Sequence, residues 1–264
     1  MSTPPPPMPQ SALPQEQVQP ALSEPARIIN TFVAPRKTFE DIRRKQSWFW
    51  PWLISAIVGV AFAFVAVQKI DTAQMVRQAM ERSPAAQRRM EQASPEQRDR
   101  MIEIQAKVSK VAFFVIPTVG GLILGLVLAA VLLGVFNFGF GTDVSFRHAL
   151  SITFYSLLPG TIGAILLIVS LLVSSDPNNI DFASGNPIPS SPAFFMDPTG
   201  NQFLYKLMSS VDIFHIWYMI LLGLGFATVA SIGRKKLAPS TAITTIFVIY
   251  FVLALARAGI AAAF

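Results

Sequence analysis

The sequence predicts an all-α, polytopic membrane protein with five transmembrane helices. Five apolar runs, at about residues 50–67, 111–136, 149–173, 213–232 and 242–263, carry few or no charges. At 1.5 Å of rise per residue, roughly 20 helical residues cross the ~30 Å hydrocarbon core of a bilayer. The mean hydropathy is +0.50, which is outside the range of ordinary soluble domains. Backbone amides in lipid must be satisfied within each segment, which favours helices over open sheets.

A disordered, proline-rich tail is predicted for residues 1–26, ahead of a five-helix domain at residues 27–264. Eight prolines fall within the first 25 positions, and such a composition favours an extended, solvated chain. A P-x-x-P pattern in this tail could dock into an aromatic-lined groove. A solvated tail without a partner is the simpler interpretation.

A short surface helix is predicted between the tail and the first span. Thr38 and Asp41 have the spacing of a capping box, which places the helix start near Phe39. The apolar residues around this helix suit a segment that lies on the membrane surface. Indole rings favour the headgroup level, so three tryptophans at the mouth of the first span are predicted interfacial anchors: Trp48, Trp50 and Trp52.

The connection between the first two spans, residues 68–110, is predicted to be a helical extramembrane loop. Ser83-Pro84 and Ser94-Pro95 each place a capping serine before a proline at the first helical position, and Gln97 strengthens the second start. A further amphipathic patch is expected at residues 202–209, before the fourth span.

The distribution of cations predicts the orientation. Arg234, Lys235 and Lys236 crowd the short connection between spans four and five, whereas residues 174–205 contain no lysine or arginine. Short cytoplasmic loops carry the excess of positive charge, so we expect a cytoplasmic N-terminus and an outside C-terminus. The expected location is a bacterial cytoplasmic membrane.

Three polar residues form a candidate intramembrane group. Arg257 lies inside the last apolar run, where a lone cation costs about 2.5–3.5 kcal/mol. Asp212 and His215 open span four on one helical face, and Asp212 is the expected counter-ion of Arg257. A structural ion pair or snorkelling is the favoured interpretation, with an ion or proton path as the alternative. An Asp-x-x-His pair is half a metal site, but the sequence offers no second ligand cluster, so no metal is expected.

Span three contains a predicted helix break at Pro159 and Gly160, because proline removes a backbone hydrogen bond. A broken helix could form a substrate site, as in transporters, although kinks without a transport role are common. In span four, Gly223 and Ala227 form a small-residue pair that permits close helix approach.

Several function classes are excluded or disfavoured. The chain has no cysteine, which excludes disulfides and thiol catalysis. It shows no phosphate-binding loop, dinucleotide turn or paired catalytic carboxylates, so an enzyme and a bound cofactor are not expected. The net charge is +6, and the cations flank the apolar runs, where the anionic leaflet attracts them. It therefore does not indicate a nucleic-acid partner.

Three motifs in order resemble the Yip1 domain family, in its bacterial branch. They are Ala34-Pro35-Arg36-Lys37-Thr38-Phe39 with Ile42 and the Trp-Pro cluster, Ser145-Phe146-Arg147-His148-Ala149 leading to Tyr155-Ser156-Leu157-Leu158-Pro159, and Asp212-x-Phe214-x-x-Trp217-Tyr218. For eukaryotic relatives the resemblance implies five spans, a cytosolic N-terminus, binding of prenylated small GTPases and roles in vesicle traffic. This chain lacks the Asp-Leu-Tyr-Gly-Pro motif of that branch, so GTPase binding is not carried over.

Two functions follow as hypotheses. The first is a non-enzymatic membrane-organising or partner-binding scaffold, whose expected partners are the lipid bilayer and a membrane protein or a second copy of the chain. The alternative is a small transporter or channel subunit that uses the Pro159 break and the Asp212/Arg257 region.

Overall fold

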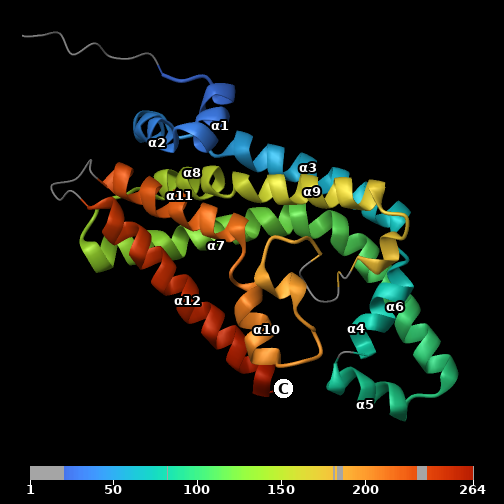
Figure 1. Cartoon of the computed structure of the whole chain (residues 1–264). Helices are drawn as coiled ribbons and strands as arrows, with labels where there is room; N and C mark the ends of the chain where they lie inside the picture. The colour runs from blue at the N-terminus through green and yellow to red at the C-terminus, as the bar shows by residue number, and fades with distance from the viewer. Residues whose placement is uncertain (1–20, 82, 181, 183–186, 231–236, 264) are drawn as a thin grey trace, which may run out of the picture.

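The structure is a computed structural model that describes residues 21–81, 83–180, 182, 187–230 and 237–263. Within these residues it consists of helices and connecting turns, without a strand (Figure 1). Five helical runs are long and apolar enough to span a membrane: Phe49–Lys69, Pro95–Gly139, Phe146–Val173, Ile213–Ala230 and Pro239–Ala261. The prediction of an all-α polytopic membrane protein is therefore confirmed.

Two short helices, α1 (Glu24–Val33) and α2 (Pro35–Arg44), precede the first span. Helix α1 begins inside the last three residues of the predicted tail, because Ser23 accepts a hydrogen bond from the Ala26 amide at 3.4 Å and Pro25 fits the first turn. The prediction that residues 24–26 are disordered was therefore wrong. Residues 1–20 of that tail lie outside the described residues.

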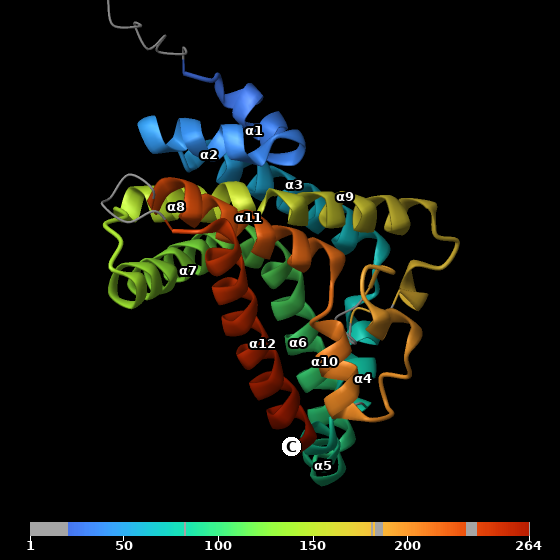
Figure 2. The same ribbon diagram turned by 60° about the vertical axis from the view of Figure 1, so that its left-hand side comes forward.

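The predicted capping box at Thr38 and Asp41 was also wrong. Helix α2 starts at Pro35, whose fixed φ suits the first helical turn. Thr38 and Asp41 lie in the middle of that helix and are buried. Figure 2 shows α1 and α2 stacked together against one end of the helix bundle. We call this pair the N-terminal cap.

The first connection contains α4 (Thr72–Glu81) and α5 (Pro84–Gln92), which follow α3 (Phe49–Lys69). Ser83 and Ser94 cap the next helices as predicted, and Ser94 forms a capping box with Gln97. The helix that Ser94 caps does not end where the loop ends. It continues through α6 (Pro95–Val115), η1 (Ile116–Gly120), α7 (Gly121–Gly134) and η2 (Val135–Gly139).

This continuous run joins the predicted helical loop to the predicted span at residues 111–136 without a break. The run has 45 residues, which at 1.5 Å per residue makes about 68 Å, more than twice the bilayer core. Its N-terminal third must therefore project from the membrane. The π-helical turn η1 surrounds Pro117, a residue that cannot donate to the α-helical ladder. A side chain at Gly59 of α3 would collide with the Pro117 ring, so glycine is needed for this helix contact.

Span three consists of α8 (Phe146–Ser156) and α9 (Leu158–Val173), preceded by a compact turn. Asn137 orders that turn: its Nδ2 donates to the Val144 carbonyl at 2.9 Å, and its Oδ1 accepts from the Val144 amide at 3.0 Å. Gly141 supplies the one positive φ, +65°, among the described residues.

The last third of the chain contains η3 (Pro177–Asn179), η4 (Pro192–Phe195), α10 (Gln202–Ser209), α11 (Ile213–Ala230) and α12 (Pro239–Ala263). Helix α10 coincides with the predicted amphipathic patch. Gly223 of α11 faces the α12 backbone, where an added Cβ would lie 2.5 Å from Ile243 Cα. The close approach expected from the Gly223–Ala227 pair therefore occurs within one chain.

The connections gather at two ends of the bundle. At one end the α2 terminus meets α8, where His148 Nε2 lies 2.8 Å from Gln46 Nε2 and 3.2 Å from the Arg43 carbonyl oxygen. At the other end the Asp71 amide, after α3, donates to Asn178 Oδ1 at 2.8 Å. Because successive spans run in opposite directions, the N-terminal cap and the α7–α8 turn lie at one end of the bundle. The α3–α4 turn and the α9–α10 connection lie at the other end.

Candidate functional site

The N-terminal cap is fixed by a buried ion pair between its two helices. Arg27 of α1 is fully buried, and its Nε donates to Asp41 Oδ2 of α2 at 2.5 Å. Arg27 Nη1 also contacts Glu24 Oε1 at 3.1 Å. Glu24 Oε2 in turn accepts the Tyr155 hydroxyl at 2.7 Å, which joins the cap to span three. Three helices, α1, α2 and α8, therefore share one charged network.

Threonines complete the network around the backbone of Arg27. The Thr31 hydroxyl donates to the Arg27 carbonyl at 2.8 Å and the Thr38 hydroxyl donates to the same oxygen at 3.0 Å. The Leu22 amide donates to Asp41 Oδ1 at 3.2 Å. Arg27 Nη2 is buried without a hydrogen-bond partner in the described part of the chain. Almost all the polar atoms of this cluster are thus satisfied internally, as burial requires.

Electrostatics keep Arg27 charged in this position. Burial by itself disfavours the guanidinium cation, but the hydrogen bond and charge of Asp41, with the charge of Glu24, outweigh it and raise the pKa of Arg27. A buried pair of this kind holds its partners in one geometry, since each charge needs the other.

Apolar packing extends the attachment of the cap to the spans. Phe39 and Ile42 of α2 are fully buried in the main core. Phe32 of α1 packs edge-on against Trp217 of α11, with ring centroids 5.7 Å apart. Phe39 lies against Gly225 of α11, where no side chain would fit. The cap is consequently part of the folded bundle rather than a separate surface helix.

The sequence did not reveal this network. The sequence pattern gave Arg27 no role, and it assigned Asp41 to a helix cap. The available signal was the pair of helix-start patterns, Ser23 before Pro25 and Ala34 before Pro35, which together mark two helices instead of one.

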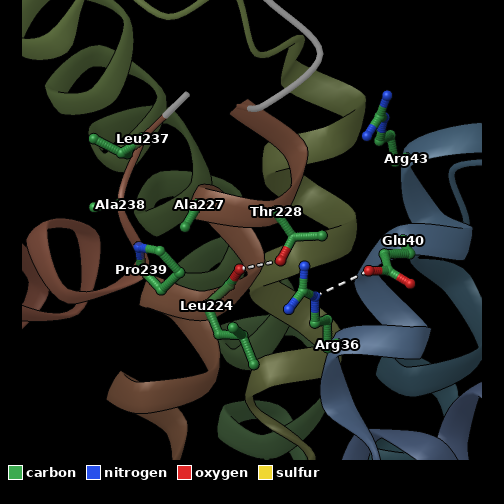
Figure 3. Close-up of a pocket in the computed structure, with 9 residues that line it drawn as sticks. All are labelled: Arg36, Glu40, Arg43, Leu224, Ala227, Thr228, Leu237, Ala238 and Pro239. Atoms are coloured by element: carbon green, nitrogen blue, oxygen red, sulfur yellow. Dashed lines mark hydrogen bonds and ion pairs between the residues drawn. The ribbon is translucent and has the colours of Figure 1, made fainter. Parts of the chain in front are cut away.

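A cavity of about 390 Å³ lies at the seam between the cap and the spans, and we call it the seam cavity. It is lined by Arg36, Glu40 and Arg43 of α2, by Leu224, Ala227 and Thr228 of α11, and by Leu237, Ala238 and Pro239 at the start of α12. Figure 3 shows the Arg36 side chain reaching from α2 toward α11, with its Nε bonded to Glu40 Oε1 at 3.0 Å. One wall is charged and the other is largely apolar.

The predicted polar group at span four is only partly assembled. Asp212 caps α11, since its Oδ1 accepts the amides of Phe214 and His215 at 2.9 and 3.1 Å. The same oxygen lies 3.2 Å from His215 Nδ1, and Oδ2 accepts the Ser190 hydroxyl. Burial alone raises the pKa of Asp212, but the hydrogen bonds of His215 and Ser190 lower it below its ordinary value.

The expected pairing of Asp212 with Arg257 does not form. Arg257 is exposed on α12 and makes no ion pair with Asp212 or any other described carboxylate. The reason is that the carboxylate of Asp212 is already occupied by the α11 N-terminus, His215 and Ser190. Snorkelling of the exposed Arg257 side chain to the membrane interface stays a prediction.

The helix interruption lies at Leu157, two residues before Pro159, and Pro159 and Gly160 themselves are in the first turn of α9. Helix α8 ends at Ser156, and Leu157 separates it from α9. A cavity of about 210 Å³ beside the break is lined mostly by apolar groups, among them Trp52, Gly59, Phe154 and Leu157. Its lining does not include Asp212, His215 or Arg257. The break and the polar group therefore do not share this cavity.

The three tryptophans occupy different environments. Trp48 stacks near Phe154, with centroids 5.8 Å apart, and Trp52 packs on the same core. Trp50 is 48% exposed, so anchoring at the membrane interface remains a prediction best suited to Trp50. Across the described residues, no group of three or more His, Asp or Glu side chains has the arrangement of a metal site.

Comparison with known families agrees with this architecture. A family model described as the Yip1 domain matches residues 29–256. The chain belongs to the Yip1 domain family. A search of curated proteins and a search of solved structures each gave no match. The Yip1 match includes the second half of α1, all of α2 and the first four spans, and it ends within the fifth span, so most of the cap is part of the family domain.

Proposed function

We propose that this Yip1 protein is a non-enzymatic scaffold of the membrane, which organises the bilayer or binds a partner protein through its N-terminal cap. The buried charged network carries the proposal, because Arg27 and Asp41 hold α1 on α2 and Glu24 accepts the Tyr155 hydroxyl of α8, which fixes the cap on the bundle. A rigid element presents its outer side chains in a constant arrangement, which lowers the entropy lost on binding.

The outer surface of the cap is suited to contacts. Ile29 and Val33 of α1 are 62% and 74% exposed, and Arg36, Lys37 and Arg43 of α2 are exposed as well. Apolar side chains flanked by lysine and arginine are typical of elements that touch a membrane surface or a partner helix. This sequence lacks the motifs for binding a small GTPase or a nucleic acid, so neither is proposed as the partner.

The proposed orientation places the cap in the cytoplasm and the C-terminus outside, in a bacterial cytoplasmic membrane. The support is the basic entry to the first span together with the alternation of connections between the two ends of the bundle. Five spans require the two termini to lie on opposite sides.

Site-specific photo-crosslinking tests the scaffold proposal. A photoreactive residue replaces Val33 on the cap or, as a control, Val173 at the end of α9; the two valines are 74% and 76% exposed. We expect discrete protein adducts from position 33 in native membranes, lost when Asp41→Ala releases α1 from α2, and only lipid adducts from position 173. Identical lipid labelling at both positions would contradict partner binding by the cap.

A further inference from the structure

The seam cavity combines features that no role described above uses. Its charged wall is the outer face of α2, with Arg36, Glu40 and Arg43. The opposite wall brings Leu224 and Leu237 to the same space. A volume of about 390 Å³ falls within the roughly 300–1,000 Å³ of small-molecule sites.

The charge of the cavity favours an anion. Arg36 is 78% exposed at its side chain and uses one of its donors on Glu40. The Arg43 guanidinium is exposed and makes no ion pair among the described residues. Two arginines against one carboxylate leave an excess positive charge. The planar guanidinium fork matches a phosphate group, to which it can donate two parallel hydrogen bonds.

The position of the cavity selects the kind of anion. Thr228 lies two residues before the end of α11, and Pro239 is the first residue of α12. Both helices belong to membrane-spanning runs, so the cavity lies where a span leaves the hydrocarbon. Headgroups occupy that level, and acyl chains lie beside the apolar wall.

We propose that the seam cavity binds an anionic glycerophospholipid. The guanidinium groups of Arg36 and Arg43 bind the phosphodiester, and an acyl chain packs along Leu224 and Leu237. Glu40 orients Arg36 through the 3.0 Å ion pair and at the same time weakens the attraction for the lipid phosphate. The site is independent of whether the cap binds a protein.

Lipid binding to the full-length protein in neutral detergent tests the proposal. Native mass spectrometry would give apparent dissociation constants for phosphatidylglycerol and phosphatidylcholine, with inorganic phosphate as a competitor. A cation near an anionic headgroup contributes about a fivefold gain in affinity. We therefore expect Arg36→Gln and Arg43→Gln each to weaken phosphatidylglycerol binding about fivefold, and the double variant roughly 25-fold.

Two further variants separate a built site from diffuse attraction. Lys37→Gln removes the same charge from an exposed position of α2 that does not line the cavity, and we expect less than a twofold change. Glu40→Gln removes the competing carboxylate and is expected to tighten phosphatidylglycerol binding.

Equal losses in Lys37→Gln and the arginine variants would overturn the proposal, because they would show unspecific charge attraction. Displacement of phosphatidylglycerol by millimolar inorganic phosphate would also overturn it, since a free phosphate would then be the ligand. Equal affinity for phosphatidylcholine would exclude an anionic lipid.

Discussion

Removing Asp41 should release α1 from α2 within the N-terminal cap. In Asp41→Ala, the fully buried Arg27 loses its 2.5 Å partner, and removal of one member of a buried ion pair costs about 3–5 kcal/mol. Glu24 remains 3.1 Å from Arg27, so we expect the lower end, about 3 kcal/mol. The opening constant of α1 would then rise roughly 100-fold.

Hydrogen–deuterium exchange of the purified protein in detergent measures that opening amide by amide. Glu40→Gln is the matched control, because it breaks an exposed ion pair of α2 whose side chains are 78% and 50% exposed. Such pairs contribute about 0.2–1 kcal/mol, so exchange should rise by no more than about fivefold.

A double replacement separates the loss of pairing from the loss of packing. Arg27→Met with Asp41→Leu removes both charges, and replacement of a buried pair by apolar residues is often neutral or stabilising. We expect slow exchange to return in this variant. Equal exchange in Asp41→Ala and Glu40→Gln would refute the role assigned to the buried pair.

Three other predictions follow from the packing and the polar groups. Gly223→Ala should destabilise the bundle by about 1–3 kcal/mol through overpacking against Ile243. Gly259→Ala should not, because nothing lies within 4 Å of an added Cβ there. Thermal unfolding in detergent distinguishes the two variants, and equal unfolding midpoints would contradict the close contact. Because the pKa of Asp212 is lowered in the folded protein, its stabilisation should be complete above its unfolded pKa of about 3.9 and be lost as the pH falls through the lower folded value. The free energy of unfolding, measured from pH 6 to pH 2.5, should show this loss, and the loss should be smaller in Asp212→Asn. An equal pH dependence in both proteins would argue against a stabilising role for the Asp212 carboxylate. In liposomes, Asp212→Asn and Arg257→Gln should leave solute flux unchanged, and loss of flux in a folded variant would favour the transporter hypothesis.

The five spans could be predicted because hydrocarbon imposes strong constraints on composition. Long uncharged runs leave few alternatives, and the predicted centres of all five agree with the structure. Boundaries at the water side were less predictable. Pro95–Val115 is polar at its start and apolar at its end, so one helix runs from the predicted loop into the predicted span, and the pattern did not show that it is continuous.

The buried network could not be read from the sequence, because it depends on tertiary distance. Arg27 and Asp41 are 14 positions apart on different helices, and Tyr155 is 131 positions from Glu24. A cation before a span has the same appearance whether it faces lipid headgroups or a buried carboxylate. By contrast, Asp212 and His215 are three residues apart on one helix, and their contact was predictable from helical spacing.

Cysteine labelling in oriented membranes tests the threading of the chain most directly, because the natural sequence contains no cysteine. One variant carries Lys37→Cys on the cap, and another carries a cysteine appended after the C-terminus. In sealed right-side-out vesicles, a membrane-impermeant maleimide should label the appended cysteine at once and Lys37→Cys only after permeabilisation. Labelling of both positions from the same side would contradict five crossings, and the reverse pattern would contradict the cytoplasmic placement of the cap.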